Sequence, residues 1–303
     1  MDYFEAIVMG AIQGITELFP VSSLGHSVLI PALVGGAWAK DLSVSAPESP
    51  YLAFIVGLHV ATALALLVFF RRDWARIIRG FFSSIKNRRI QTAPERLFWL
   101  LVIATIPVGI TGLVLEHTFR TVLGKPIPAA IFLMINGVVL GAGELLRRRA
   151  ARREPVTATA SVETGEPDTL GEDAVLGTIP PWRAVAIGAA QTFALLPGIS
   201  RSGIAMVGGM AVGLSHREAA RFSFLLATPV ILAAGLLKLP DLFGPLGHGI
   251  QGQVLAGSAA AFVAALVAVG FLDRYFRTRT LLPFAVYSLL AGAGSLLWLT
   301  IHG

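Results

Sequence analysis

The chain has 303 residues, of which 55% are hydrophobic and only 14% are charged, and its mean hydropathy is +0.73. Soluble domains carry about a quarter of charged residues, so this chain has too little polar surface to cover a water-soluble globule. Cysteine is absent, which excludes disulfide scaffolds, thiolate metal sites and cysteine nucleophiles. The composition therefore predicts an all-α integral membrane protein.

Six stretches are long and apolar enough to cross a bilayer as helices, for which about 20 mainly apolar residues are needed. Four of them contain no Asp, Glu, Lys or Arg, and two shorter ones reach the required length with flanking residues that snorkel. A β-barrel would need ten-residue alternating segments instead, which the sequence does not offer. In chain order, the six predicted helices are 51–70, 97–115, 127–143, 222–237, 250–272 and 280–301.

The basic residues orient these helices. Eight Lys or Arg residues lie in 71–96, five in 147–153 and three in 274–279. The positive-inside rule places these three loops in the cytoplasm. The loops at 116–126 and 238–249 hold only three basic residues together, so we expect them to face outward.

Two segments are left over, 1–45 and 182–217, and each is too short for two full crossings. The predicted orientation requires the first to begin and end outside and the second to begin and end inside. Each is interrupted in its middle by a proline, at Pro20 and at Pro197, the second followed by Gly198. Both segments are therefore predicted to be re-entrant helical hairpins that enter from opposite faces.

The whole chain then reads as one membrane domain over 1–303, built as an inverted-topology repeat. Repeat 1 is 1–146, the cytoplasmic linker is 147–181, and repeat 2 is 182–303. Repeats of this kind place functional sites near the bilayer midplane, where broken helix ends meet. The linker part 154–181 has six acidic residues, no basic ones and no apolar period, so we expect it to be disordered.

Polar side chains gather in the first hairpin, where ionisable groups within an apolar segment suggest function. Gln13 and Glu17 are four residues apart and share one helix face. Ser22, Ser23 and His26 follow directly after the proline break. A carboxylate, two hydroxyls and an imidazole supply the parts for metal binding or nucleophilic chemistry.

The second hairpin has the character of an anion site. Gly198 and Gly203 free the backbone to turn N–H groups toward an anion. Between them stands Arg201, whose planar donor fork suits phosphate oxygens, with Ser200 and Ser202 on either side. An arginine at a hairpin tip needs a counter-charge, which Glu17 of the other hairpin can supply.

Structural roles are the alternative for the same residues. Glu17 and Arg201 could form an ion pair that only holds the hairpins together, and the serines could be helix caps. Gln13 could be an interhelical hydrogen-bonding residue, and His26 a core histidine. The concentration of these residues at two symmetry-related breaks favours a functional site.

Four further polar residues have weaker signals. His59 lies inside helix 51–70 and faces either the site or only a neighbouring backbone. Asn136, near several glycines, indicates helix packing. Glu144 precedes the basic run 147–153 and is expected to pair with it, whereas His216 is expected to be solvated.

The two motifs Gln13-xxx-Glu17 with Pro20-Val21-Ser22-Ser23-x-Gly25-His26, and Pro197-Gly198-Ile199-Ser200-Arg201-Ser202, stand in the two halves of the chain. Together they resemble the undecaprenyl-diphosphatase family, the bacitracin-resistance lipid phosphatases of bacterial membranes. The sequence departs from that family at Ala205 and Met206, where the second motif usually ends with a threonine.

The resemblance implies hydrolysis of undecaprenyl diphosphate to undecaprenyl phosphate and inorganic phosphate, a phosphoric anhydride hydrolysis that recycles the lipid carrier for cell-wall synthesis and confers bacitracin resistance. It also implies a divalent metal, Mg²⁺ or Ca²⁺, and a location in the bacterial plasma (inner) membrane with the active site open to the extracytoplasmic side. The expected partners are the polyprenyl diphosphate substrate and the bilayer, with no nucleic acid; a homodimer is compatible with this reading.

On this basis Ser23 is the expected nucleophile, and His26 is placed to orient or deprotonate it. Glu17 is expected to bind the metal or act as the base, and Gln13 to help hold metal or water. The residues expected to bind the diphosphate are Arg201, Ser200, Ser202 and Ser22, with the backbone of Gly198 and Gly203.

Two alternatives stay open. His26 could itself be the nucleophile and form a phosphohistidine, with Ser23 as a binding group. The other alternative is a transporter, since inverted repeats with broken helices are also a transport architecture. In that case Arg201 would bind the anion and Glu17 would couple a proton or cation. A purely structural membrane scaffold leaves an arginine near the bilayer midplane unexplained.

Overall fold

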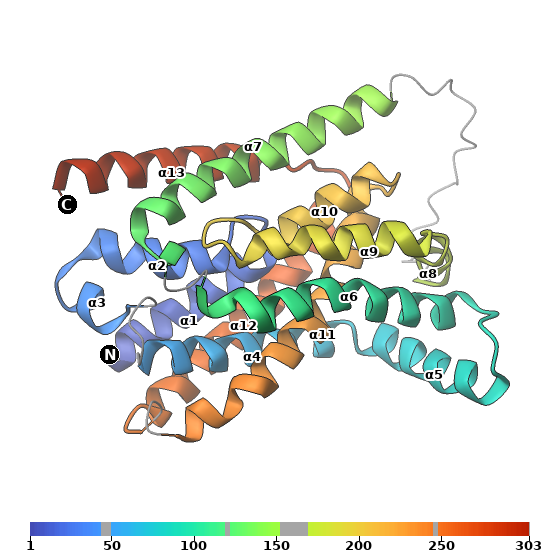
Figure 1. The fold of residues 1–303 in the computed structure, drawn as a ribbon, viewed down its shortest axis with the longest axis horizontal. Coiled ribbons are helices and arrows are strands. Elements are labelled where there is room, and N and C mark those ends of the chain that lie inside the picture. The colour runs from blue at the N-terminus through green and yellow to red at the C-terminus, as the bar shows by residue number, and fades with distance from the viewer. Residues whose placement is uncertain (44–49, 119–121, 152–168, 245–247, 303) are drawn as a thin grey trace.

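The structure, a computed structural model, describes residues 1–43, 50–118, 122–151, 169–244 and 248–302. Within these ranges the chain is all-α and has no β-strand (Figure 1). In chain order the elements are α1 (Tyr3–Leu18), α2 (Ser23–Val34), α3 (Gly36–Asp41), α4 (Pro50–Phe69), α5 (Arg71–Asn87), α6 (Ala93–Thr118), α7 (Pro126–Ala151), α8 (Thr169–Gly177), α9 (Pro181–Ala190), the 3₁₀ helix η2 (Gln191–Leu195), α10 (Arg201–Ala211), α11 (His216–Phe243), α12 (Gln251–Tyr275) and α13 (Leu282–His302).

Among the described residues, six helices are long and apolar enough to cross a membrane, as predicted: α4, α6, α7, α11, α12 and α13. The chain is a multi-pass membrane protein. The helices extend beyond the predicted limits where the sequence caps them. Helix α11, for example, begins at His216 because Ser215 and Glu218 form a capping box, in which each side chain accepts a hydrogen bond from the other residue's backbone N–H.

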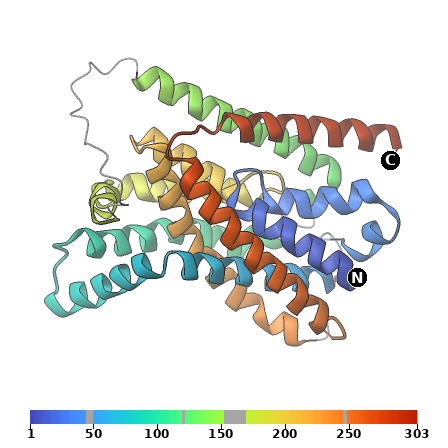
Figure 2. The same cartoon turned by 180° about the vertical axis from the view of Figure 1, so that it is seen from behind.

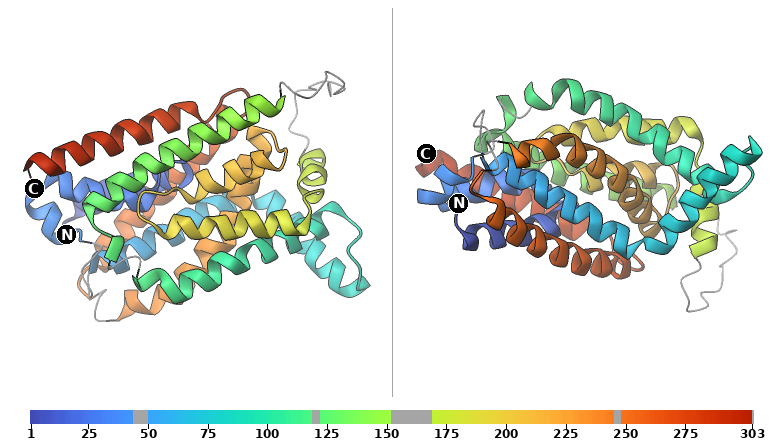
Figure 3. Two further views of the ribbon diagram at one scale, coloured as in Figure 1. Left: turned by 45° about the horizontal axis from the view of Figure 1, so that its top comes forward. Right: turned by 90° about the horizontal axis from the view of Figure 1, so that it is seen from below.

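Small residues let the first helix approach its neighbour closely. A Cβ atom added at Gly10 would lie 2.2 Å from the carbonyl oxygen of Gly257, and one at Gly14 would lie 2.3 Å from that of Ala261. Helix α1 therefore packs backbone to backbone against α12, and the two helices run side by side (Figure 2). Helix α13 instead runs beside α7 along one side of the bundle (Figure 3).

The basic loop predicted at 71–96 contains a 17-residue helix, α5, which folds back on α6. Its buried side chains include Ile77 and Ser84, and the Ser84 hydroxyl accepts a hydrogen bond from the Trp99 indole at 3.1 Å. The many arginines suggest a loop, but Arg71, Arg72 and Arg79 lie on the exposed side of an amphipathic helix, and only Arg76 of α5 is half-buried.

The predicted disordered linker 154–181 is wrong over 169–177, which form α8; 152–168 lie outside the described residues. The reason is an ion-pair cluster. Asp173 is buried and pairs with Arg221 at 2.5 Å and Arg76 at 3.1 Å, and Asp73 pairs with the same two arginines. The acidic composition of the linker therefore serves, in part, to dock α8 on α5 and α11.

The prediction for Glu144 is confirmed, and that for His216 is wrong. Glu144 accepts a hydrogen bond from Arg148 of the basic run at 2.9 Å. His216 is buried, with its Nε2 atom 2.6 Å from the same carboxylate. Capping of α11 at Ser215 turns the histidine into the bundle, which its neighbours in the sequence do not reveal.

Two helix pairs are interrupted at the predicted prolines. Helices α1 and α2 are separated by 19–22, and the α9–η2 segment is separated from α10 by 196–200. The re-entry of these pairs into the bilayer and their inverted symmetry stay predictions, as does the division into 1–146 and 182–303. The two interruptions nonetheless meet in the interior of the bundle.

Candidate active site

At the first break the backbone turns at Ser22, which adopts a positive φ of 68°. Its hydroxyl caps α2 by accepting a hydrogen bond from the N–H of Gly25 at 3.2 Å. The same oxygen accepts a second bond, at 3.1 Å, from the N–H of Gly198 in the other break. Gly198 has φ 111°, and a Cβ there would lie 2.4 Å from the Ala129 carbonyl oxygen, so only glycine fits this junction.

Asn136 of α7 fastens the two breaks to each other. Its Nδ2 atom donates to the carbonyl of Pro20 at 2.9 Å, and its Oδ1 atom accepts from the N–H of Ser200 at 2.9 Å. The side chain is buried and also donates to the Ser288 hydroxyl at 3.2 Å. Asn136 therefore does more than the predicted helix packing, because its side chain hydrogen-bonds to backbone groups that the two interruptions leave unpaired.

Glu17 lies at the centre of the cluster and is buried. Its carboxylate accepts hydrogen bonds from the Ser23 hydroxyl, from the guanidinium of Arg201 and, at 3.1 Å, from the amide of Gln13. His59 of α4 completes the group, with Nε2 3.4 Å from the carboxylate and 3.3 Å from the Gln13 amide nitrogen. The structure therefore brings four predicted site residues together and resolves the open question for His59 in favour of the site.

Two atoms of this cluster are buried without a partner in the described part of the chain: Nη1 of Arg201 and Oε1 of Gln13. An unsatisfied buried polar group lowers the stability of the fold by about 1–3 kcal/mol, so each such group in a native structure needs an explanation. The guanidinium offers a donor suited to an anion, and the amide oxygen an acceptor suited to a cation or water. The two together fit an anionic ligand with its counter-ion.

Both ring nitrogens of His26 bind groups other than Ser23. Its Nδ1 atom is 2.7 Å from the Ser22 carbonyl oxygen, which can only accept, so Nδ1 carries a proton. Nε2 then accepts from the Tyr287 hydroxyl at 2.7 Å, and the two rings stack with centroids 5.8 Å apart. No hydrogen bond joins His26 to Ser23 in the described residues. Tyr287 of α13 was missed because a tyrosine in an apolar helix resembles an interface anchor.

The serine hydroxyls of the second break form hydrogen bonds within the protein. Ser200 caps α10 by accepting from the Gly203 N–H at 3.1 Å, and its hydroxyl lies 3.0 Å from that of Ser202. Ser202 also donates to the Phe19 carbonyl at 3.3 Å. These groups, like Ser22 and the Gly198 N–H, shape the junction, and their contact with a diphosphate stays a prediction.

The cluster offers few ligands for a metal. Among the described residues, no group of three or more His, Asp and Glu side chains could hold a metal ion. Glu17 offers a metal one carboxylate, and Gln13 offers its unpartnered amide oxygen. Mg²⁺ in proteins is commonly held by one or two carboxylates together with substrate phosphates, so this small oxygen set fits a hard divalent cation that the substrate helps to bind.

Comparisons with known proteins agree over nearly the whole chain. The family described as bacitracin resistance protein BacA matches residues 6–294. An undecaprenyl-diphosphatase of Mycolicibacterium paratuberculosis is 65% identical over 304 residues, covering 100% of this chain and 99% of that protein. Undecaprenyl-diphosphatase 2 of Frankia alni is 55% identical (97% and 96% covered), and undecaprenyl-diphosphatase 1 of Burkholderia pseudomallei is 41% identical (100% and 99% covered).

Proposed function

We propose a function from one premise: the chain belongs to the bacitracin resistance protein BacA family. It is an undecaprenyl-diphosphatase, which hydrolyses undecaprenyl diphosphate to undecaprenyl phosphate and inorganic phosphate, and its activity confers bacitracin resistance. The observation that carries this proposal is the buried cluster of Glu17, Ser23 and Arg201, in which an arginine donor has no protein partner.

Ser23 is the nucleophile. Its hydroxyl donates to Glu17, so the carboxylate is placed to take the proton as the oxygen attacks the terminal phosphorus. A bond forms between Ser23 Oγ and phosphorus, and the bond from phosphorus to the bridging oxygen breaks, releasing undecaprenyl phosphate. Glu17 passes that proton to the departing phosphate, then takes a proton from the water molecule that attacks the phosphoserine, and gives it to Ser23 Oγ as the phosphorus–Oγ bond breaks and inorganic phosphate leaves.

Arg201 stabilises the transferred phosphoryl group. One nitrogen of the guanidinium is held by Glu17, which fixes its orientation, and the unpartnered Nη1 is left to donate to an equatorial phosphate oxygen. Transition-state charge in phosphoryl transfer accumulates on these oxygens, so a pre-oriented cation acts where it is most effective. Because the site is buried, this interaction is weakly screened by water.

Gln13 and Glu17 would hold a divalent cation, Mg²⁺ or Ca²⁺, through the oxygens described above. When bound, the ion supplies positive charge that offsets the charge of the diphosphate. His59, beside both residues, orients the Glu17 carboxylate and the Gln13 amide by its contacts at 3.4 Å and 3.3 Å.

The enzyme acts in the bacterial plasma (inner) membrane, with its site open to the extracytoplasmic side. The opening of the site to that side follows from the family resemblance, and the distribution of Lys and Arg over the loops supports only the orientation of the helices. The polyprenyl chain would lie in the lipid between helices while the diphosphate enters the polar cluster. Hydrolysis there recycles the lipid carrier for cell-wall synthesis.

The deciding experiment measures phosphate release from undecaprenyl diphosphate by the purified protein beside Ser23→Ala, Arg201→Ala and an EDTA-treated sample. Release by the wild type that is lost in all three, and restored to the EDTA sample by Mg²⁺ or Ca²⁺, supports the proposal. Release that survives Ser23→Ala would move the nucleophile elsewhere. Lipid binding by folded, metal-supplied protein without any release would indicate a transporter and overturn the proposal.

A further inference from the structure

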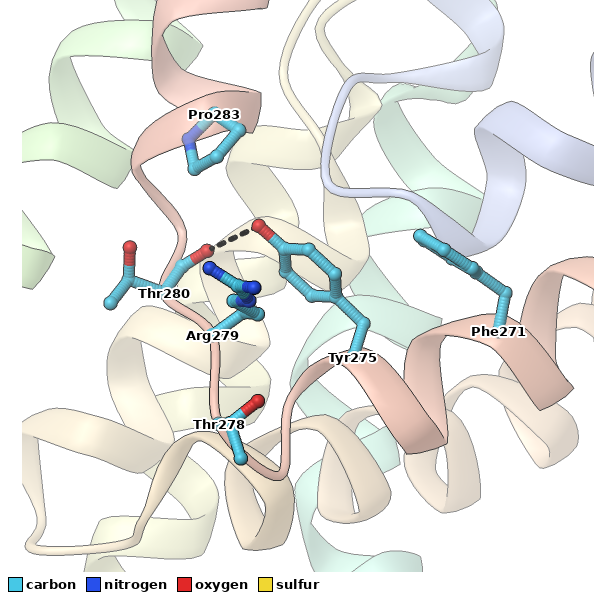
Figure 4. A pocket seen from close by; sticks show the side chains of 6 residues that line it. All are labelled: Phe271, Tyr275, Thr278, Arg279, Thr280 and Pro283. Carbon is cyan, nitrogen blue, oxygen red and sulfur yellow. Dashed lines mark hydrogen bonds between the residues drawn. The ribbon is translucent and has the colours of Figure 1, made fainter.

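A pocket of about 540 Å³ lies at the turn between α12 and α13, and its wall residue Phe271 stacks on Phe19 of the first break with ring centroids 5.8 Å apart. It is lined by aromatic side chains of α12 on one side and by the turn on the other (Figure 4). The hydroxyl of Tyr275 donates to the Thr280 carbonyl at 3.3 Å and ties these two walls together. The pocket is an open depression of the surface and not an enclosed cavity.

The polar side of the pocket carries one cation that is free to bind a ligand. Arg279 is exposed and forms no ion pair with a carboxylate in the described part of the chain. The nearest acid along the chain, Asp273, is already engaged by Arg277 at 3.0 Å and by Arg217 at 3.6 Å. The hydroxyl-bearing residues Thr278 and Thr280 flank Arg279 in the pocket wall. A guanidinium beside hydroxyls is a recognition set for phosphate oxygens.

The apolar side continues along the exposed face of α12. Val263, Val267 and Phe271 follow one another at intervals of four residues, so they form one stripe on the helix. Their exposed fractions are 60%, 69% and 50%. The stripe ends at the pocket, where Phe271 forms part of the wall. A hydrocarbon chain on this stripe would place its polar head at Arg279.

We propose that this pocket binds an anionic membrane phospholipid, with the headgroup phosphate on Arg279 and an acyl chain along the Val263–Val267–Phe271 stripe. The turn has three arginines, Arg274, Arg277 and Arg279, which assign it to the cytoplasmic face. Anionic lipids of the cytoplasmic leaflet are drawn to such positions, at roughly 1 kcal/mol for each basic residue near the surface. The proposal does not depend on the proposed hydrolysis.

The test is a titration of the purified full-length chain with phosphatidylglycerol and, separately, with phosphatidylcholine, with bound lipid counted by native mass spectrometry. We expect phosphatidylglycerol to bind preferentially and Arg279→Gln to weaken it about fivefold, the factor that corresponds to one surface cation. Arg277→Gln is the matched control, because it removes the same charge from the same turn but from a residue that is paired with Asp273 and does not line the pocket. Its binding should stay within about twofold of the wild type.

Two further measurements test the location and the lipid nature of the ligand. Phosphatidylglycerol with a photoreactive group in its acyl chain should label the α12 stripe near Phe271 in the wild type and less in Arg279→Gln. Inorganic phosphate at millimolar concentration should not displace the lipid. Equal losses in Arg277→Gln and Arg279→Gln, labelling elsewhere, or displacement by free phosphate would each overturn the proposal.

Discussion

Glu17 and Arg201 stand 184 positions apart in the chain and form a largely buried ion pair that joins the two interrupted helix pairs. Burying such a pair is costly, because both charges lose their water, and apolar residues of equal volume often stabilise a protein as well or better. The pair here is also incomplete, since one guanidinium nitrogen has no partner among the described residues. A pair kept only for stability would be expected to satisfy that nitrogen, so the arrangement favours a site that a ligand completes.

Arg201→Lys should keep the fold but lose most of the activity. A lysine retains the charge opposite Glu17, yet a single ammonium cannot hold the carboxylate and a phosphate oxygen in the fixed directions of the guanidinium fork. We expect kcat for phosphate release to fall by about 100-fold, as for other losses of one transition-state donor. Thermal unfolding of the same sample serves as the control: a large drop in Tm would assign the loss to folding instead.

Ser23→Ala and His26→Asn should differ sharply. Ser23 contacts Glu17, whereas both ring nitrogens of His26 are engaged, with Ser22 and Tyr287. Loss of the nucleophile should abolish release, while His26→Asn should retain measurable turnover because it changes the support of the site and not the attacking group. Acid quenching with substrate labelled in the terminal phosphate should trap phosphoserine at Ser23. Trapped phosphohistidine, or an inactive His26→Asn with normal Tm, would favour the alternative.

Much of the fold could be predicted because a bilayer imposes simple rules. Length and apolar composition located all six long helices, and the prolines located both interruptions. The errors lie where charges are satisfied by distant partners. Asp173 and Arg221 are separated by 48 positions, and no local pattern shows that an acidic linker will dock through that pair.

The cluster residues Glu17, Ser23 and Arg201 could be predicted because they are polar residues in apolar segments. Their proximity could be inferred from the two helix breaks, but the residues that support them could not. Asn136 and Tyr287 act through hydrogen bonds to Ser200 and His26, and such contacts depend on how helices far apart in the sequence pack against each other.

Asn136→Ala should weaken both stability and catalysis, since it leaves the Pro20 carbonyl and the Ser200 N–H without their partner. Unsatisfied buried groups cost about 1–3 kcal/mol each. If Asn136 positions the site, kcat should fall by a larger factor than KM changes. The two interrupted segments would shift relative to each other, while the lipid-facing surface that binds the polyprenyl chain would stay the same. The matched control is Ser288→Ala, which removes only the 3.2 Å contact with the same amide. Similar effects of both variants would reduce Asn136 to a packing residue.

Asp173→Asn should release α8 from the bundle. Asp173 and Arg221 are both buried, and removing one partner of a buried ion pair costs about 3–5 kcal/mol. Limited proteolysis should therefore cut within 169–177 faster in the variant than in the wild type. Asp41→Asn is the control, since Asp41 pairs with the N-terminal amine at an exposed position and should contribute at most about 1 kcal/mol. Unchanged cleavage in Asp173→Asn would mean that other contacts dock α8.

The orientation can be tested with single cysteines, because the chain has none of its own. Gln91 and His248 are both exposed and lie in loops that the basic residues assign to opposite faces. A membrane-impermeant maleimide added to intact cells, with the outer membrane permeabilised where there is one, should label His248→Cys. It should label Gln91→Cys only after the plasma membrane is opened, because the arginines around Gln91 keep that loop inside. The reverse pattern would invert the topology and place the α12–α13 pocket at the outer leaflet.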